Sequence, residues 1–354
     1  MNFSVTCTFL IYFLLTGLLH AQTANFEWVR HNAGTEGPIY VHKTRTDSQG
    51  NIYTIGNFNG DNGISHADFD PTDGVTQIDS LGSGDIYIQK LTSGGAFGWA
   101  KVVGGPDNEE VASYRESFLI DSGGKLVIAG SFQGTADFDS DPITTTDQLT
   151  SNGEYDSFVL KLAADGSFEW VKGFGNANSD DSPSMVLDSQ GNIFVIGSFS
   201  GTIDFDPDNP ATQHQVTSQS GSLDAFVLKL NTNGDVVWVK SFGGSSFDLI
   251  EYIVLDTQGN ILVTGFFSDT VDFNPDPAIT DNLQSNGNTD VYVFKLNSNG
   301  DFVWAKSYGN SGDENAPVIV LDTQDNVILT GSFSGTVDFN PDPNTQYLLT
   351  PVAS

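Results

Sequence analysis

The sequence predicts an all-β fold, a β-propeller of about five four-stranded antiparallel blades that forms either a complete ring or an incomplete ring or fragment. One landmark is a recurring tryptophan, with successive spacings of 71, 71, 68 and 66 residues, at Trp28, Trp99, Trp170, Trp238 and Trp304. A second is the aspartate that opens an Asp-Phe pair, at Asp68, Asp137, Asp204, Asp272 and Asp338. Each unit also holds two pairs of β-branched or aromatic runs joined by polar turns, mostly with glycine, which is typical of β-hairpins.

Four strands are expected in each unit, in a fixed order. Strand one ends at an aspartate, which is Asp47, Asp121, Asp188, Asp256 or Asp322. Strand two carries the glycine of a Gly-x-Phe motif, at Gly56, Gly130, Gly197, Gly265 and Gly331. Strand three is the run of the type FVLKL, and strand four contains the tryptophan. A string of separate β-sandwiches fits less well, because the unit is shorter than the roughly 100 residues of an immunoglobulin-type domain.

The N-terminal segment, residues 1–21, is predicted to be a signal peptide. It has no charged side chain, an apolar run over residues 9–19 and a small residue, Ala21, before Gln22. The run is shorter than the roughly 20 apolar residues that span a bilayer. Cys7, the single cysteine, lies in this segment, so the mature chain would form no disulfide. We therefore expect a secreted or cell-surface protein whose residues 22–354 form one domain of about five repeats of roughly 67 residues.

The charge of the chain excludes some classes of partner. With 45 acidic and 13 basic residues the formal net charge is −32, and such a surface repels nucleic acid and anionic lipid. No later stretch is apolar enough for membrane insertion. A share of 12% aromatic residues argues against disorder. A folded, acidic surface points instead to divalent cations as partners.

The two ends of the chain leave two alternatives open. The mature chain begins with a fourth strand, residues 25–31, and ends in the fifth unit before a third strand. Trp28 could complete the blade that residues 318–321 open, which would give a five-bladed ring with a thin closing blade. Because native proteins normally cover an open sheet edge, the other alternative is a fragment of a longer protein.

The repeats resemble the bacterial SBBP-type β-propeller repeats found in exported proteins. The matching residues form the D-x-x-G-N turn, as in Asp188, Gly191 and Asn192, followed by an alternating strand and its closing glycine. The resemblance covers nearly all of residues 25–340. It implies the propeller fold and brings no defined activity. The second unit departs from the D-x-x-G-N pattern, with DSGGK at residues 121–125. The fifth unit has Asp325 in place of the turn glycine.

Acidic residues alternate in the connection between strands two and three of every unit. The candidate metal ligands are Asp68, Asp70, Asp73, Asp137, Asp139, Asp141, Asp204, Asp206, Asp208, Asp272, Asn274, Asp276, Asp338, Asn340 and Asp342. Oxygen ligands at alternate positions can converge on one hard cation, so the sequence predicts Ca²⁺ sites here, with magnesium and sodium left open. The loops lack the glycine and distal glutamate of an EF-hand. The alternative is a strand end that buries phenylalanine, exposes aspartate and then turns.

Strand direction places the connections from strand two to three and from strand four to the next strand one on the same face. The latter connections are also acidic, with Glu36, Glu109, Asp181, Asp248 and Asp313. We expect one face rich in carboxylates, which as individual residues would form a solvated rim.

The sequence assigns no catalytic residue and leaves open whether the protein is an enzyme. It has no serine nucleophile elbow, metalloprotease helix or phosphate loop. The leading hypothesis is a non-enzymatic exported binding or adhesion module for an extracellular protein or glycan. The alternative is a carbohydrate-active, glycosidase-like enzyme that uses two carboxylates of the acidic face. Its candidates lie in the least repeat-like stretch, residues 107–118, with Glu109 and Glu116.

Overall fold

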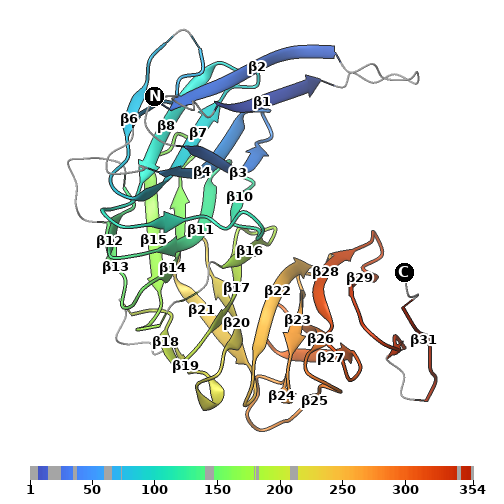
Figure 1. Ribbon diagram of the computed structural model, residues 1–354. Coiled ribbons are helices and arrows are strands. Elements are labelled where there is room, and N and C mark those ends of the chain that lie inside the picture. Colours follow the sequence, from blue (N-terminus) through green and yellow to red (C-terminus); the bar gives the residue numbers. More distant parts are fainter. Residues whose placement is uncertain are drawn as a thin grey trace, which may run out of the picture. The chain divides into compact units, whose positions relative to one another are not determined.

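In the described residues the regular secondary structure is almost entirely β-strand (Figure 1). The computed structural model describes residues 7–14, 25–34, 38–59, 66–72, 74–139, 147–178, 180, 183–207, 214–340 and 344–351. Within these ranges the one helical segment is a 3₁₀ turn, Gln219–Gly221. The predicted all-β class is confirmed.

The chain divides into two compact units. One comprises Met1–Ser113, Phe118–Thr150 and Leu160–Val171. The other comprises Tyr114–Ser117, Ser151–Val159 and Lys172–Ser354.

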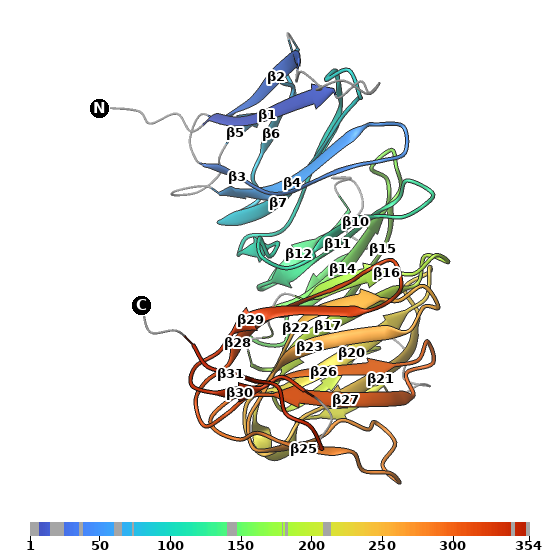
Figure 2. The same ribbon diagram turned by 90° about the vertical axis from the view of Figure 1, so that its right-hand side faces the viewer.

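Antiparallel sheets of four strands repeat along the chain, in the order that the sequence predicts. They are β3 (Ile39–Thr46), β4 (Ile52–Asn59), β7 (Gly84–Leu91) and β8 (Phe97–Val103); β10 (Phe118–Ile120), β11 (Leu126–Phe132), β14 (Asp156–Leu162) and β15 (Phe168–Phe174); β16 (Ser184–Leu187), β17 (Ile193–Phe199), β20 (Asp224–Leu230) and β21 (Val236–Phe242); and β22 (Asp248–Leu255), β23 (Ile261–Phe267), β26 (Asp290–Leu296) and β27 (Phe302–Tyr308). A short strand, β9 (Glu109–Glu110), also pairs with β11. Figure 2 shows β22, β23, β26 and β27 side by side.

The first and last strands differ from the predicted closing blade. β1 (Cys7–Leu14), inside the predicted signal peptide, pairs antiparallel with β2 (Asn25–Gly34). β2 also pairs with β5 (His66–Asp68), while β28 (Asn315–Leu321) and β29 (Val327–Ser332) form a two-stranded sheet. The described strands therefore form no closed ring, and the partners of β2 are β1 and β5 rather than the strand that contains residues 318–321.

Each connection between strands two and three contains a small hairpin that is not expected from the sequence. The hairpins are β5 (His66–Asp68) with β6 (Gln77–Asp79), β12 (Thr135–Asp137) with β13 (Gln148–Thr150), β18 (Thr202–Asp204) with β19 (Gln215–Thr217), β24 (Thr270–Asp272) with β25 (Asn282–Gln284), and β30 (Val337–Asp338) with β31 (Leu348–Leu349). Strands of two or three residues are too short to show a period-two pattern. The first strand of each hairpin ends at the aspartate of the Asp-Phe pair.

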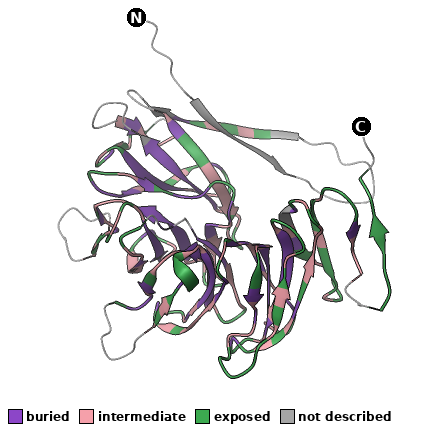
Figure 3. Cartoon of the chain, turned by 60° about the horizontal axis from the view of Figure 1, so that its bottom comes forward, coloured by how far each residue is buried: buried purple, intermediate pink, exposed green. Residues whose placement is uncertain are grey.

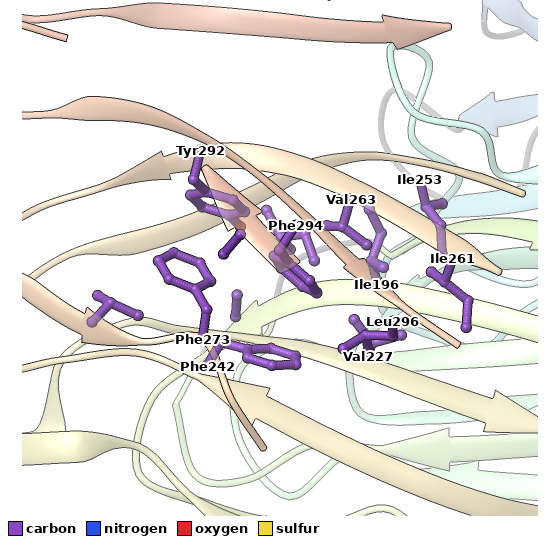
Figure 4. Close-up of a cluster of buried hydrophobic side chains, with 14 of the residues drawn as sticks. Ile196, Val227, Phe242, Ile253, Ile261, Val263, Phe273, Tyr292, Phe294 and Leu296 are labelled. Carbon is purple, nitrogen blue, oxygen red and sulfur yellow. The ribbon is translucent and has the colours of Figure 1, made fainter. Parts of the chain in front are cut away.

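Buried residues concentrate in the inner strands of the sheets, while much of the connecting chain is exposed (Figure 3). Strands β11 and β17 are buried along their whole length. Figure 4 shows one core cluster, in which the rings of Phe242 and Phe294 lie 4.5 Å apart and those of Phe273 and Tyr292 lie 4.9 Å apart. Phe273 belongs to an Asp-Phe pair and is 1% exposed. The phenylalanine of this motif is therefore a core residue.

The D-x-x-G-N turn is held by its first aspartate. In the fourth unit Asp256 Oδ1 accepts hydrogen bonds from the backbone N–H groups of Gln258 and Asn260, both at 2.9 Å. Asp322 accepts the equivalent pair of bonds in the fifth unit. There Asp325, with a φ of +62°, takes the left-handed conformation of the missing glycine. The departure at this position thus leaves the turn intact.

Replacing Lys295 by methionine is expected to lower the free energy of unfolding by about 1 kcal/mol at pH 7. Lys295 Nζ lies 2.7 Å from Asp256 Oδ2. Burial alone would raise the pKa of Asp256, but the bonds from Lys295 and the turn lower it to about 2. A depressed carboxyl pKa stabilises the fold above its unfolded value and loses that effect as the pH falls toward 2.

Urea unfolding at pH 7 and at pH 2.5 would measure this loss. The matched control is a double-mutant cycle with Asp256→Asn. Equal effects of Lys295→Met at both pH values would contradict the prediction.

Candidate functional site

The first aspartate of each predicted cation loop braces a turn. Asp68 Oδ1 accepts hydrogen bonds from the backbone N–H groups of Asp70, at 3.0 Å, and Thr76, at 2.8 Å. Asp272 and Asp338 accept the same two kinds of bond, and Asp137 and Asp204 accept at least the first. Asx turns of this kind favour alternating acidic residues without any cation.

The later loop positions are less uniform. In the fourth unit Asn274 Oδ1 accepts from the N–H of Asp276, which continues the series of turns. Asp206 is 6% exposed and lies 3.8 Å from Lys172 Nζ. Asp139 and Asn340 donate their N–H groups to the preceding aspartate. Asp73, Asp141, Asp208 and Asp342 lie outside the described residues.

Across the described residues, no group of three or more His, Cys, Asp or Glu side chains is arranged to hold a metal ion. Calcium binding by the loops therefore stays a prediction.

The two kinds of connection do lie together, as strand direction predicts. Gly104, which follows strand four, pairs with Asp137 at the end of β12 through two backbone hydrogen bonds of 3.0 and 2.8 Å. In another unit, the Asn176 side chain donates to the carbonyl of Ser200 at 2.6 Å. At these two places the connection after strand four is thus held against the connection between strands two and three of the next unit.

Pairs of buried carboxyl groups repeat beside these connections. One member is the aspartate at the start of strand three, and the other lies at or near the next strand one. The pairs are Asp85 with Glu109, Asp156 with Asp180, Asp224 with Asp248, and Asp290 with Glu314. All eight side chains belong to residues no more than 4% exposed. The expectation of a solvated rim is therefore wrong for Glu109 and Asp248, whereas Glu36 and Asp181 lie outside the described residues.

Each carboxyl group caps a turn that precedes it in the chain. Asp156 Oδ2 accepts from the backbone N–H of Asn152 at 3.0 Å, and Asp180 Oδ2 accepts from that of Asn176 at 2.8 Å. The other pairs repeat this pattern, with donors at Leu81, Gly105, Gln219, Gly244, Asn286 and Asn310. One oxygen of every carboxyl group is thus fixed by backbone.

The second oxygens differ between pairs. Among the described residues nothing donates to Asp85 Oδ1, Glu109 Oε1, Asp156 Oδ1, Asp180 Oδ1 or Asp290 Oδ1. In contrast, Asp224 Oδ1 accepts from Ser222 Oγ at 3.0 Å, and Asp248 Oδ1 accepts from the N–H of Ser268 at 3.3 Å. Unpartnered oxygens in a dry interior are costly, so the first two pairs require a proton or a cation.

A glycine that follows strand four leaves space for the buried carboxyl groups. A Cβ on Gly104 would stand 2.1 Å from Asp85 Oδ1 and 2.4 Å from Glu109 Oε2. A Cβ on Gly175 would stand 2.3 Å from Asp156 Cγ. Any side chain at these positions would collide with the carboxyl groups, which therefore occupy the space that glycine leaves.

Burial is the main cause of the raised pKa values in these pairs. It raises the pKa of Asp85 to about 6 and, with the charge of Asp85 adding to it, that of Glu109 to about 8. It raises the pKa of Asp180 to about 7, with a further contribution from the charge of Asp156. Asp224 and Asp248 reach about 6 and about 7. The charges that act on these groups come from other carboxylates.

The sequence did contain a signal for these pairs. The second acid follows the first by 24 residues in all four pairs, at Asp85, Asp156, Asp224 and Asp290. Asp180 and Glu314, rather than the neighbouring Asp181 and Asp313, match Glu109 and Asp248. Glu109 is thus a repeated residue and not a feature of an irregular unit.

An apolar pocket of about 830 Å³ lies beside β29. Its lining includes Trp304, Tyr308, Leu329, Phe333 and Phe339. Among the described strands β29 pairs only with β28.

Comparisons with known proteins give distant relatives. No family model matches the chain. The WD repeat-containing protein L264 of Acanthamoeba polyphaga mimivirus is 24% identical over 213 residues, which are 54% of this chain and 15% of that protein. The regulatory protein FlaEY of Caulobacter vibrioides is 25% identical over 243 residues, which are 64% of this chain and 22% of that protein. The chain thus spans less than a quarter of the length of either relative.

A crystal structure of a Bacteroides caccae protein of unknown function covers 84% of this chain and 93% of its own, at 11% identity and a TM-score of 0.31. Separately, no helix in the described ranges has the length and apolar character needed to cross a bilayer.

Proposed function

We propose that this chain is an exported, non-enzymatic β-propeller module of SBBP-type repeats that binds an extracellular protein or glycan. One observation carries the proposal: the polar groups of the fold recur at equivalent positions in successive units. Catalysis by two carboxylates needs one acid and one base set apart from the rest. Glu109, one of the two enzymatic candidates in the sequence, instead has counterparts at Asp180, Asp248 and Glu314.

The propeller rests on two supports, and export rests on a third observation. The sheets have four antiparallel strands each and follow one another along the chain, as blades do. The likeness to a WD repeat-containing protein points the same way, since WD repeats are propeller repeats. The apolar segment at residues 9–19 supports export.

Purified protein tested on a glycan array and on chromogenic glycosides is expected to show binding without turnover. Glu109→Gln and Glu116→Gln variants are the controls, because the enzymatic alternative depends on these carboxylates. Hydrolysis that persists through purification and is lost in either variant would contradict the proposal.

Calcium at the acidic loops is the second part of the proposal. Replacing Asp272 and Asp276 together by asparagine is expected to remove one bound calcium ion per chain, because neutral oxygens are weaker ligands than carboxylates. Equilibrium dialysis with metal analysis would count the ions, and sodium at equal ionic strength would control for screening. An unchanged ion count would show that this loop is an acidic turn that binds no calcium.

A further inference from the structure

We propose that the Asp85–Glu109 and Asp156–Asp180 pairs each bind one hard divalent cation between the start of the third strand of one sheet and the segment that leads to the first strand of the next. This inference concerns residues outside the acidic loops and does not depend on the proposed function. It starts from the unpartnered oxygen that each of these four carboxyl groups directs into a dry interior.

The four side chains are buried and fixed in position by backbone hydrogen bonds. Asp85, Glu109, Asp156 and Asp180 are 0%, 0%, 2% and 4% exposed, and the turn N–H groups fix one oxygen of each. The fixed oxygens set the direction of the others. Asp85 Oδ1 and Glu109 Oε2 both lie within 2.4 Å of the point where a Cβ on Gly104 would stand. The unpartnered Asp85 Oδ1 and the oxygen of Glu109 that accepts the Gly105 N–H therefore lie beside the same glycine.

Among the described residues, the charges that act on Glu109 and Asp180 are all negative. Glu109 is affected by the negative charges of Asp85 and Asp107, and Asp180 by that of Asp156. No lysine or arginine is among the groups that shift either carboxyl. Two ionised carboxylates this deeply buried repel each other and lack water, so both can be charged only with a cation between them.

Carboxylate oxygens are the ligands of hard cations such as calcium, which takes six to eight oxygens in flexible geometry. Each pair supplies two carboxylates, and backbone carbonyls and water would supply the rest. The pair lies next to the backbone contacts that join consecutive units, such as the hydrogen bond of 2.8 Å from the Asp180 N–H to the Tyr155 carbonyl. A bound cation would therefore connect the two elements at this junction.

The chain contains its own matched control. Asp224 and Asp248 occupy the equivalent positions and are equally buried, but each of their four oxygens accepts a hydrogen bond. No oxygen of this pair is buried without a hydrogen bond, so the pair lacks the unpartnered oxygens from which the proposal starts. The proposal therefore predicts that it binds none.

The test uses the full chain with calcium chloride as the probe. Ions bound per chain are counted after dialysis for the unchanged protein, for Asp156→Asn with Asp180→Asn, and for the control Asp224→Asn with Asp248→Asn. The first variant should lose one ion and the control none. If the first variant does not fold, Asp85→Asn with Glu109→Gln provides the same comparison. The Asp272 and Asp276 loop variant, measured in parallel, separates these sites from the loops.

Proton release distinguishes a cation from a shared proton. Calorimetry at pH 7 in buffers of different ionisation enthalpy should show release of about one proton per calcium at a buried pair, because the ligands must be deprotonated. The exposed loops should release none. Equal ion counts in the unchanged protein and both pair variants would overturn the proposal and identify the pairs as carboxyl groups that share a proton. Loss of all bound calcium in the loop variant would also overturn it.

Discussion

Gly265→Ala is expected to lower the free energy of unfolding by at least about 3 kcal/mol, the upper range for a forced overpacking of a core. A Cβ at this position would stand 2.0 Å from the carbonyl oxygen of Leu249 and 2.6 Å from the hydroxyl of Tyr292. That hydroxyl donates to the same carbonyl at 2.9 Å. The methyl group would displace backbone and a buried hydrogen bond together.

The collision has a structural cause. The register between β22 and β23 shifts between Ile250 and Tyr252, and Gly265 lies opposite Ile250 at this bulge. A bulge bends its strand toward the partner, here bringing a carbonyl over the facing residue. The first complete sheet repeats the arrangement, since Gly56 faces Val41 at a bulge and a Cβ there would lie 1.7 Å from the carbonyl oxygen of Tyr40.

Gly94→Ala is the matched control, because Gly94 is exposed in a turn and a Cβ there meets no atom closer than 4.0 Å. Chemical denaturation of the two variants at pH 7 would measure the difference. A Gly265→Ala protein as stable as Gly94→Ala would show that the sheet accommodates the methyl group and that the bulge does not fix this residue.

The strand order was readable from the sequence because strands two and three are buried runs bounded by turn residues. The glycine of Gly-x-Phe was also visible, but the carbonyl it accommodates depends on a bulge in another strand. Short hairpins such as β12 with β13 were missed since three residues give no periodicity. These features depend on contacts between residues far apart in the sequence, which local sequence patterns do not predict.

The candidate site was predictable in part. Strand direction correctly placed the two kinds of connection together, as at Gly104 and Asp137. The burial of the paired carboxyl groups could not be predicted from the sequence. An acidic residue near a loop is normally exposed, and the chain has many such residues. The constant distance between Asp156 and Asp180, repeated in three other pairs, was the one sequence signal that set these acids apart.

In the presence of a chelator, the free energy of unfolding is expected to fall by on the order of 5 kcal/mol between pH 5 and pH 8. Burial raises the pKa of Asp85, Asp180 and Glu109 to about 6, about 7 and about 8, whereas an unfolded chain has values near 4. Above pH 4 the unfolded state loses protons that the folded state still holds. Stability from these groups is complete below pH 4 and is lost as the pH rises through their folded values.

Urea titrations at half-unit pH intervals with chelator would measure this slope, and the variant with Asp156→Asn and Asp180→Asn should reduce it because amides do not titrate. Added calcium should restore stability at pH 8 more than at pH 5, since the ion replaces the protons that the pairs lose. The Asp224 and Asp248 pair, with pKa values of about 6 and about 7, should keep a residual slope even with calcium. Stability that rises steadily from pH 5 to pH 8 without calcium would contradict this, because it would mean that the buried pairs are already ionised at pH 5.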